Sequence, residues 1–397
     1  MKTIDRLSPE ICRRFRDAIN ESPIISNEMT DLYNLSCAVM DRIDTAVNYL
    51  NSNWEYPKTE ESFMCFLLFA CMLNDGVDKI YTKTLGGKPG CNVEKKYFGA
   101  FCKMEPLCFN DDEIPIDEDF FEHLRSLAFA HPYETNRKKS FKDKFGNQVS
   151  PWVIVNSHMF HMYKIEEPIG VRLYSSVKDK NGNDLHDIII SFSAIKEFLI
   201  EKYSVLDEVT LWIKNESQKV YVKWKDRKIN RQQAPCDVLR EICQILDSRH
   251  ESIYSIEEMI SYLEISLSDE RNKKYVDEYR QYLLGTISVL CDCVESLDTV
   301  GQYEQERKIS VFYPCGLHQM AHYQLEKIFS YLGEKSTYIS SGSNEEWGLK
   351  MAKNFYEEFA YKWVVIDVYS MSYTEIKLLV IVALFMECKE QGRLDIR

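Results

Sequence analysis

Residues 59–72, Thr-Glu-Glu-Ser-Phe-Met-Cys-Phe-Leu-Leu-Phe-Ala-Cys-Met, are the stretch that decides the fold of the first third of the chain. Thr59 followed by Glu60 and Glu61 is typical of a helix start, because a threonine oxygen caps free backbone N–H groups and acidic side chains favour the first turn. From Phe63 onward, apolar residues cover nearly the whole circumference of the expected helix. Such a helix is buried on most sides, so we expect it at the centre of a helical bundle.

The segments around this helix also carry helical patterns, and we expect residues 1–135 to be entirely helical. Ser8 before Pro9 supplies a capping residue and a proline at the first helical position. Residues 27–50 have apolar side chains at spacings of three and four. Shorter helices are expected at about 93–103 and at 117–130. Pro132 ends the last of them, because the residue before a proline is driven out of the α region.

The pattern changes after residue 145. Lys180-Asn-Gly-Asn183 is typical of a hairpin turn between two strands, and a helix is expected at Ala194–Tyr203. Together these features predict a small α+β module of about five strands. The runs rich in β-branched and aromatic residues that predict these strands are Trp152–Asn156, Val171–Ser175, Ile188–Phe192, Thr210–Ile213 and Val220–Trp224.

The remainder of the chain is expected to be helical again. Apolar residues at helical spacing predict helices at Asp237–Ser248, Ile256–Leu267, Asp269–Ser296, Leu317–Leu332, Glu345–Tyr361 and Thr374–Lys389. The predicted fold is therefore mainly α with an α+β insertion. We expect a helical domain over 1–145, a small sheet module over 146–232 and a C-terminal helical domain over 233–397.

The composition limits the classes of function. A net charge of −13 argues against a protein that coats nucleic acid without specificity, because such binding depends on neutralising phosphates. A local basic groove is still compatible with this charge. The 13 scattered cysteines include several in apolar helical stretches, which is typical of reduced thiols in a cytoplasm.

No segment has the pattern of a targeting or membrane signal. Met1–Arg14 lacks the apolar core of a signal peptide. The longest apolar run, Leu378–Met386, is much shorter than the roughly 20 residues that span a bilayer. We therefore expect a cytoplasmic protein without a membrane partner.

Residues 124–132, Leu-Arg-Ser-Leu-Ala-Phe-Ala-His-Pro, contain the candidate catalytic residues Arg125, Ser126 and His131. An arginine can hold a phosphate with two parallel hydrogen bonds, and a histidine can transfer protons near neutral pH. Together they suffice for cleaving RNA without a metal, so we expect no metal and no other cofactor. Basic residues just after the His-Pro step can bind backbone phosphates. These candidate RNA-binding residues are Arg137, Lys138, Lys139, Lys142 and Lys144.

The spacing of Arg125 and His131 limits how they can act together. Six positions at about 100° each place the two side chains about 120° apart on an ideal α-helix. One regular helix therefore cannot direct both at the same phosphate. A two-fold pairing of identical helices can bring two Arg/His sets together, and for this reason we expect a homodimer.

The helical layout together with Arg-x5-His resembles the HEPN superfamily, whose ribonucleases carry Arg-x4-6-His near a helix of a small bundle. The resemblance covers about residues 27–135. Ser126 stands where Asn, Asp or His is more usual in that family. The resemblance implies a metal-independent ribonuclease that acts as a dimer, in prokaryotic anti-phage defence or a toxin–antitoxin system. The family's residue roles carry over only to Arg125, Ser126 and His131.

Three further patterns have metal-ligand character. His318-x3-His322 has the spacing of two zinc ligands on a helix, but no third ligand can be assigned, and a surface or interhelix role is favoured. His158 and His161 have a similar spacing, with even less support. The Cys-Asp-Cys sequence at 291–293 lacks a second cysteine pair, so two core cysteines are favoured.

A second basic stretch, residues 219–228, reads Lys-Val-Tyr-Val-Lys-Trp-Lys-Asp-Arg-Lys and falls on a predicted strand. Aromatic and cationic side chains in alternation can bind nucleic acid by stacking and phosphate contact. A solvated outer strand whose charges prevent edge pairing is slightly favoured over that interpretation.

Two functions follow from the sequence. The first is a metal-independent endoribonuclease that leaves a 2′,3′-cyclic phosphate, with RNA as substrate. The second is a catalytically inactive HEPN-like interaction or regulatory protein, which the acidic charge and long apolar helices suit equally well. A regulatory protein partner is compatible with both.

Overall fold

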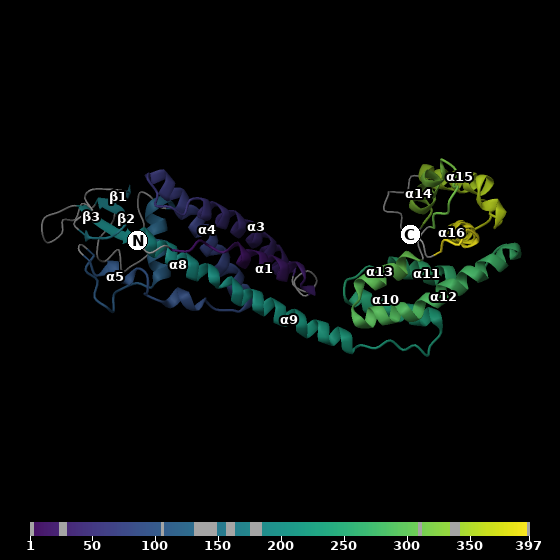
Figure 1. Cartoon of the computed structure of the whole chain (residues 1–397), viewed down its shortest axis with the longest axis horizontal. Helices are drawn as coiled ribbons and strands as arrows, with labels where there is room; N and C mark the ends of the chain where they lie inside the picture. The colour runs from purple at the N-terminus through teal and green to yellow at the C-terminus, as the bar shows by residue number, and fades with distance from the viewer. Residues whose placement is uncertain are drawn as a thin grey trace. The chain divides into compact units, whose positions relative to one another are not determined.

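The computed structural model describes residues 4–23, 30–104, 107–130, 149–155, 163–174, 185–308, 312–333 and 342–394. The chain divides into two compact units, Met1–Val220 and Tyr221–Arg397, called here unit 1 and unit 2. The described residues are mainly helical, and their three-stranded sheet lies in unit 1 (Figure 1). The boundary between the units falls within one long helix, α9 (Leu206–Asp226).

The helices of unit 1 pack around α4. Its hydrophobic pattern continues past residue 72, and the helix runs from Glu60 to Thr84, in contact with α3, α6 and α8. The described helical elements of unit 1 besides α9 are α1 (Pro9–Asn20), α3 (Thr30–Ser52), α4 (Glu60–Thr84), η1 (Gly90–Val93), α5 (Gly99–Cys102), α6 (Asp117–Arg125), η2 (Ser126–Ala130) and α8 (Phe192–Ser204). The single helix expected at 93–103 is wrong, because only the four residues of α5 are α-helical there.

The start of α4 agrees with the sequence signal. The Thr59 hydroxyl accepts a hydrogen bond from the Ser62 N–H, and the Ser62 hydroxyl accepts one from the Thr59 N–H, both at 3.2 Å. This reciprocal arrangement satisfies two free N–H groups at once. Phe63, Phe66 and Leu67 follow at no more than 1% exposure. This face of α4 is buried as expected, whereas Cys65 and Leu68, which is 46% exposed, leave another side of the helix open to solvent.

The sheet of unit 1 consists of β1 (Val149–Val155), β2 (Pro168–Tyr174) and β3 (Leu185–Ser191), antiparallel and in that order. Val153 pairs with Val171, which pairs with Ile188 on its other side. All three belong to the same hydrophobic core as the helices of unit 1. The described strands therefore share one core with the helices of unit 1, and the division between the two compact units falls at Val220.

Two of the five expected strands are wrong. Thr210–Ile213 and Val220–Trp224 both lie in α9. The side chains at 206, 209, 210, 213 and 217 are buried, at spacings of three and four that match a helix. The described part of the central region therefore has three strands. The expected turn Lys180–Asn183 lies outside the described residues, although the strands on either side of it, β2 and β3, are antiparallel neighbours.

Unit 2 is helical in its described parts. Its core surrounds α16 (Tyr373–Glu390), where residues 378–385 are at most 2% exposed. The sequence analysis did not predict a helix at 299–307, where the structure has α13, whereas the long helices that it predicted lie close to their expected positions. The remaining helical elements are α10 (Pro235–Ser248), α11 (Tyr254–Glu264), η4 (Glu270–Asn272), α12 (Lys273–Ser296), α13 (Thr299–Arg307), α14 (Ala321–Tyr331), α15 (Gly342–Glu358) and η5 (Ala360–Lys362).

Candidate functional site

Arg125 is the last residue of α6, and the chain continues from it into the π turn η2. The helix expected over 117–130 is thus an α-helix from Asp117 to Arg125 and a π-helix from Ser126 to Ala130. π-Helical turns occur often at functional sites, because they change the direction of the following side chains. The offset of about 120° derived for a regular α-helix therefore does not describe this segment.

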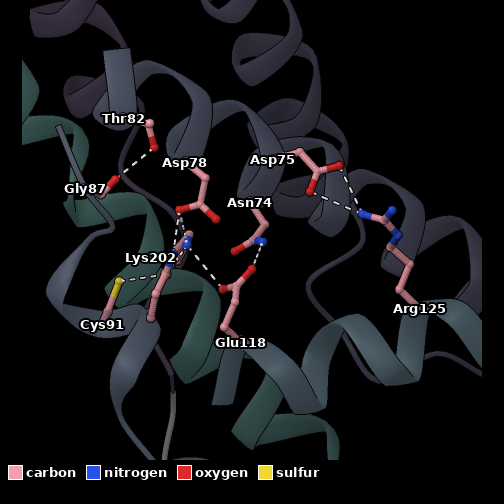
Figure 2. A network of polar contacts seen from close by, with 10 residues as sticks. Asn74, Asp75, Asp78, Thr82, Gly87, Cys91, Glu118, Arg125 and Lys202 are labelled. Carbon is pink, nitrogen blue, oxygen red and sulfur yellow. Dashed lines mark hydrogen bonds and ion pairs between the residues drawn. The ribbon is translucent and has the colours of Figure 1, made fainter. Parts of the chain in front are cut away.

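The Arg125 side chain is held at the surface by an ion pair with α4. Its Nη1 lies 3.1 Å from Oδ2 and 3.2 Å from Oδ1 of Asp75. Figure 2 shows the guanidinium reaching Asp75 through this one nitrogen. The side chain of Arg125 is 21% exposed and that of Asp75 is 51% exposed. Arg125 is thus accessible from solvent but fixed in direction.

The other candidate residues fall in two groups. Ser126 is completely buried, so its hydroxyl faces the protein interior. His131 lies outside the described residues, and so do the candidate RNA-binding residues Arg137, Lys138, Lys139, Lys142 and Lys144.

Next to Arg125 lies a buried polar network that the sequence did not suggest. Lys202 of α8 is completely buried, and its Nζ lies 2.5 Å from Asp78 Oδ1 and 3.2 Å from Glu118 Oε2. The same ammonium donates to Asn92 Oδ1. Glu118 in turn accepts a hydrogen bond of 2.6 Å from Asn74 Nδ2. Figure 2 shows these side chains converging between α4, α6 and α8.

This network and the Arg125 ion pair join the same two helices. Glu118 and Arg125 are seven residues apart on α6, which places them on one face. Their partners Asn74 and Asp75 are neighbours on α4. Two contacts between α4 and α6 therefore fix the position of Arg125: the buried hydrogen bond between Asn74 and Glu118, and the surface ion pair between Asp75 and Arg125.

The charges in the network are unequal. One ammonium, on Lys202, faces two carboxylates, on Asp78 and Glu118. Burial raises the pKa of Glu118, while Lys202 and the hydrogen bond from Asn74 oppose that rise. The nearby Cys91 thiol has its pKa raised to about 11, mainly by burial. It is therefore protonated at neutral pH and unsuited to act as a nucleophile.

The start of α6 is fixed by a further buried carboxylate. Asp117 accepts hydrogen bonds from the backbone N–H groups of Lys96, Tyr97 and Phe98, at 2.6–3.1 Å. Three backbone donors satisfy a buried carboxylate without a cation. Both ends of α6 are thus attached to other parts of unit 1, which leaves Arg125 on a rigid helix.

The two histidines of the possible zinc motif point to different partners. His318 precedes α14, and its Nε2 lies 2.7 Å from Glu358 Oε2 and 2.8 Å from Gln324 Oε1. His322 stacks on the ring of Tyr313. The expected i, i+4 arrangement on one helix is therefore wrong. Over the described ranges, no three His, Cys, Asp or Glu side chains gather closely enough to hold a metal ion.

The structure also describes some of the other sequence patterns that were considered as possible sites. Cys291 and Cys293 are buried free thiols of α12, as the core interpretation predicts. His158 and His161 lie outside the described residues. The basic stretch 219–228 belongs mostly to α9 and is not a strand. In the part of the chain that the structure describes, no helix has both the length and the apolar character needed to cross a membrane.

Comparison with known proteins identifies no relative: no protein-family model, no curated protein and no solved structure matches the chain.

Proposed function

We propose that the chain is a metal-independent endoribonuclease of the HEPN type, in which Arg125 and His131 are the catalytic residues. The observation that supports this function best is the placement of Arg125 at the surface end of α6. Asp75 holds its guanidinium through Nη1, and no other hydrogen bond joins it to the described residues. Its remaining donors are free to hold a phosphate in the planar geometry that arginine favours.

The proposed reaction is an internal transesterification of RNA. The ribose 2′-oxygen forms a bond to phosphorus, and the bond from phosphorus to the 5′-oxygen breaks. His131 removes the proton from the 2′-hydroxyl or delivers a proton to the leaving 5′-oxygen. Arg125 stabilises the negative charge that builds up on the phosphate. The products carry a 2′,3′-cyclic phosphate and a 5′-hydroxyl.

A homodimer is part of the proposal. One histidine holds one proton, whereas the reaction needs a base on one side of the phosphate and an acid on the other. Two copies with their 125–131 segments near a two-fold axis provide both groups. The buried Ser126 supports the packing of the π turn in this arrangement and does not touch RNA.

The test is cleavage of a mixed RNA in EDTA by the full chain and by Arg125→Ala and His131→Ala variants. Each variant should lose about 10²–10⁴-fold in rate, the usual contribution of a proton-transfer or charge-stabilising group. Arg14→Ala is a matched control, because Arg14 forms an exposed ion pair with Asp207 at 2.6 Å. His322→Ala is the histidine control. Cleavage that requires added Mg²⁺, or full activity of His131→Ala, contradicts the proposal.

A catalytically inactive interaction protein is the second candidate. It is favoured by the ion pair itself, since Asp75 already neutralises the charge that Arg125 would offer a phosphate. In that case the purified chain leaves RNA intact under every condition above, and Arg125→Ala changes only the α4–α6 contact.

A further inference from the structure

One side of α4 carries a contiguous row of apolar residues that is open to solvent. Cys65 and Leu68 are exposed, Leu68 by 46%, and Met64 and Met72 beside them are half-buried. Met64 and Cys65 precede Leu68 by four and three residues and Met72 follows it by four, so all four lie on one face of the helix. These four residues are called here the α4 stripe. Single exposed apolar side chains are normal on a protein surface, whereas a continuous row indicates contact with another protein.

Opposite charges lie at the two ends of the α4 stripe. Glu61 lies seven residues before Leu68, and Lys79 lies seven residues after Met72. Seven residues make about two helical turns, so both charges share the face of the stripe. Both side chains are exposed, and neither has an ionic partner among the residues that the structure describes. Within one chain they are about 27 Å apart along the helix axis, too far to pair with each other.

The order of these residues is symmetric about the point midway between Leu68 and Met72. If two copies of α4 lie antiparallel across a two-fold axis at that point, Leu68 of one copy faces Met72 of the other. Glu61 of one copy then faces Lys79 of the other, and this pair occurs twice because the interface is isologous. In a parallel two-fold pair each residue would face its own counterpart, which would bring like charges together. The charge pattern therefore favours the antiparallel arrangement.

The remaining charge on this face does not oppose such a pair. Asp75 falls opposite Cys65 of the second copy, and it is already paired with Arg125 of its own chain at 3.1 Å. The contact therefore contains no unpaired carboxylate. Antiparallel helices that cross at about 20° lie 8–10 Å apart, and the long side chains of Glu61 and Lys79 can bridge the slightly larger gap near the ends.

We propose that the α4 stripe binds the α4 stripe of a second copy of this chain, in an antiparallel pair with Glu61 of each copy against Lys79 of the other. One pair of helices buries less surface than a permanent dimer needs, so the dimer forms reversibly at micromolar or higher concentration. This surface is inferred from α4 alone. The homodimer of the function proposed above gains from it a specific contact, beside the Arg125 that Asp75 holds on α4.

The test exchanges the two charges and measures dimerisation of the full chain by sedimentation equilibrium. Glu61→Lys or Lys79→Glu replaces two attractive contacts of the dimer by two repulsive ones. An exposed ion pair changes an equilibrium constant by at most about fivefold, so each single variant should dimerise about 5- to 50-fold more weakly than the parent. The double variant restores opposite charges at both places and should dimerise within about threefold of the parent.

The matched controls are Lys164→Glu and Glu166→Lys, which change the net charge equally. Both residues are exposed in unit 1, lie outside α4 and have no ionic partner among the described residues. Thermal unfolding verifies that every variant folds. A second measurement follows iodoacetamide labelling as the protein concentration rises. Cys65 should become protected in the parent and in the double variant, whereas Cys108, an exposed thiol outside α4, should not.

A parent chain that stays monomeric up to sub-millimolar concentration overturns the inference, and so do single variants that dimerise like the controls. A double variant as weak as the single variants refutes the antiparallel register. Cleavage of RNA in EDTA is measured separately. If the chain dimerises with this charge pattern but leaves RNA intact, the proposed function is wrong and the α4 surface stands. If cleavage depends on Arg125 and His131 while dimerisation ignores Glu61 and Lys79, only the α4 surface is wrong.

Discussion

Replacing Lys202 by methionine leaves the carboxylates of Asp78 and Glu118 in unit 1 without their shared ammonium group. Lys202 is completely buried and Glu118 is 6% exposed, so solvent cannot replace the lost cation at Glu118, whereas the Asp78 side chain, which is 28% exposed, still contacts water. Removing one partner from a buried ion pair costs about 3–5 kcal/mol, because the remaining charge is left unpaired. In a unit of this size, a loss of 1 kcal/mol lowers the melting temperature by about 2–4 °C. We therefore expect the melting temperature of unit 1 to fall by about 6–20 °C.

Scanning calorimetry of the full chain measures this change, with the transition of unit 2 as an internal reference. Lys96→Met is the matched control, because Lys96 forms an exposed ion pair of 2.6 Å with Glu201, the neighbour of Lys202. Exposed pairs contribute little, so its transition should barely move. A triple variant, Lys202→Met with Asp78→Asn and Glu118→Gln, should recover part of the loss, since it contains no unpaired charge.

The effect of Lys202→Met should also depend on pH. Burial raises the pKa of Glu118, and loss of the ammonium should raise it further. The folded state then binds a proton more tightly than the unfolded state does, so stability is greatest below the unfolded pKa and falls as pH rises through the folded pKa. The loss should be larger at pH 8 than at pH 5. A Lys202→Met variant as stable as Lys96→Met, or a loss independent of pH, would refute the argument that an unpaired charge is its cause.

Three further outcomes are expected. Asp75→Asn should leave thermal unfolding nearly unchanged, since its ion pair is partly exposed, yet slow RNA cleavage because Arg125 loses its fixed direction; an unchanged rate would contradict the role of Asp75. Gly348→Ala should destabilise unit 2 by about 1–3 kcal/mol in denaturant titrations, because the new Cβ would lie 2.9 Å from Leu332 Cδ2; a gain in stability would mean that helix propensity outweighs this contact. Iodoacetamide at pH 8 should modify exposed cysteines before buried ones, as mass spectrometry can show, because burial raises the pKa of Cys12 and Cys102 to about 12 and only the thiolate reacts. The exposed set is Cys65, Cys108 and Cys315.

The sequence predicts the long helices well and the short elements poorly. α3, α4 and α12 each offer more than twenty residues over which a spacing of three and four repeats, so local exceptions average out. The segments mistaken for strands in α9 were judged over four or five residues each. Val, Thr, Ile and Trp favour strands in windows that short, whereas the periodicity of the whole of α9 is helical.

Only part of the candidate site could be predicted from the sequence. Arg125 could be found because its motif is local. Its partner Asp75 is fifty residues away, and nothing in one sequence indicates that α4 meets α6 at that position. Lys202 was overlooked because lysine is rarely buried. The sequence did contain an indication that Lys202 is buried. Lys202 follows Ile195 by seven residues and Phe198 by four, and these spacings place all three side chains on the same apolar face of the helix.

The polar network between α4, α6 and α8 also has a consequence for synthesis of the chain. Lys202 follows Glu118 by 84 residues, which a ribosome adds in roughly 4–17 s at about 5–20 residues per second. During that interval the first helices have emerged, but the ammonium that will neutralise Asp78 and Glu118 has not yet been made. We therefore expect the carboxylates of Asp78 and Glu118 to stay hydrated until α8 has been synthesised. A fragment that ends near residue 145 would lack Lys202, and these carboxylates would remain unpaired in it.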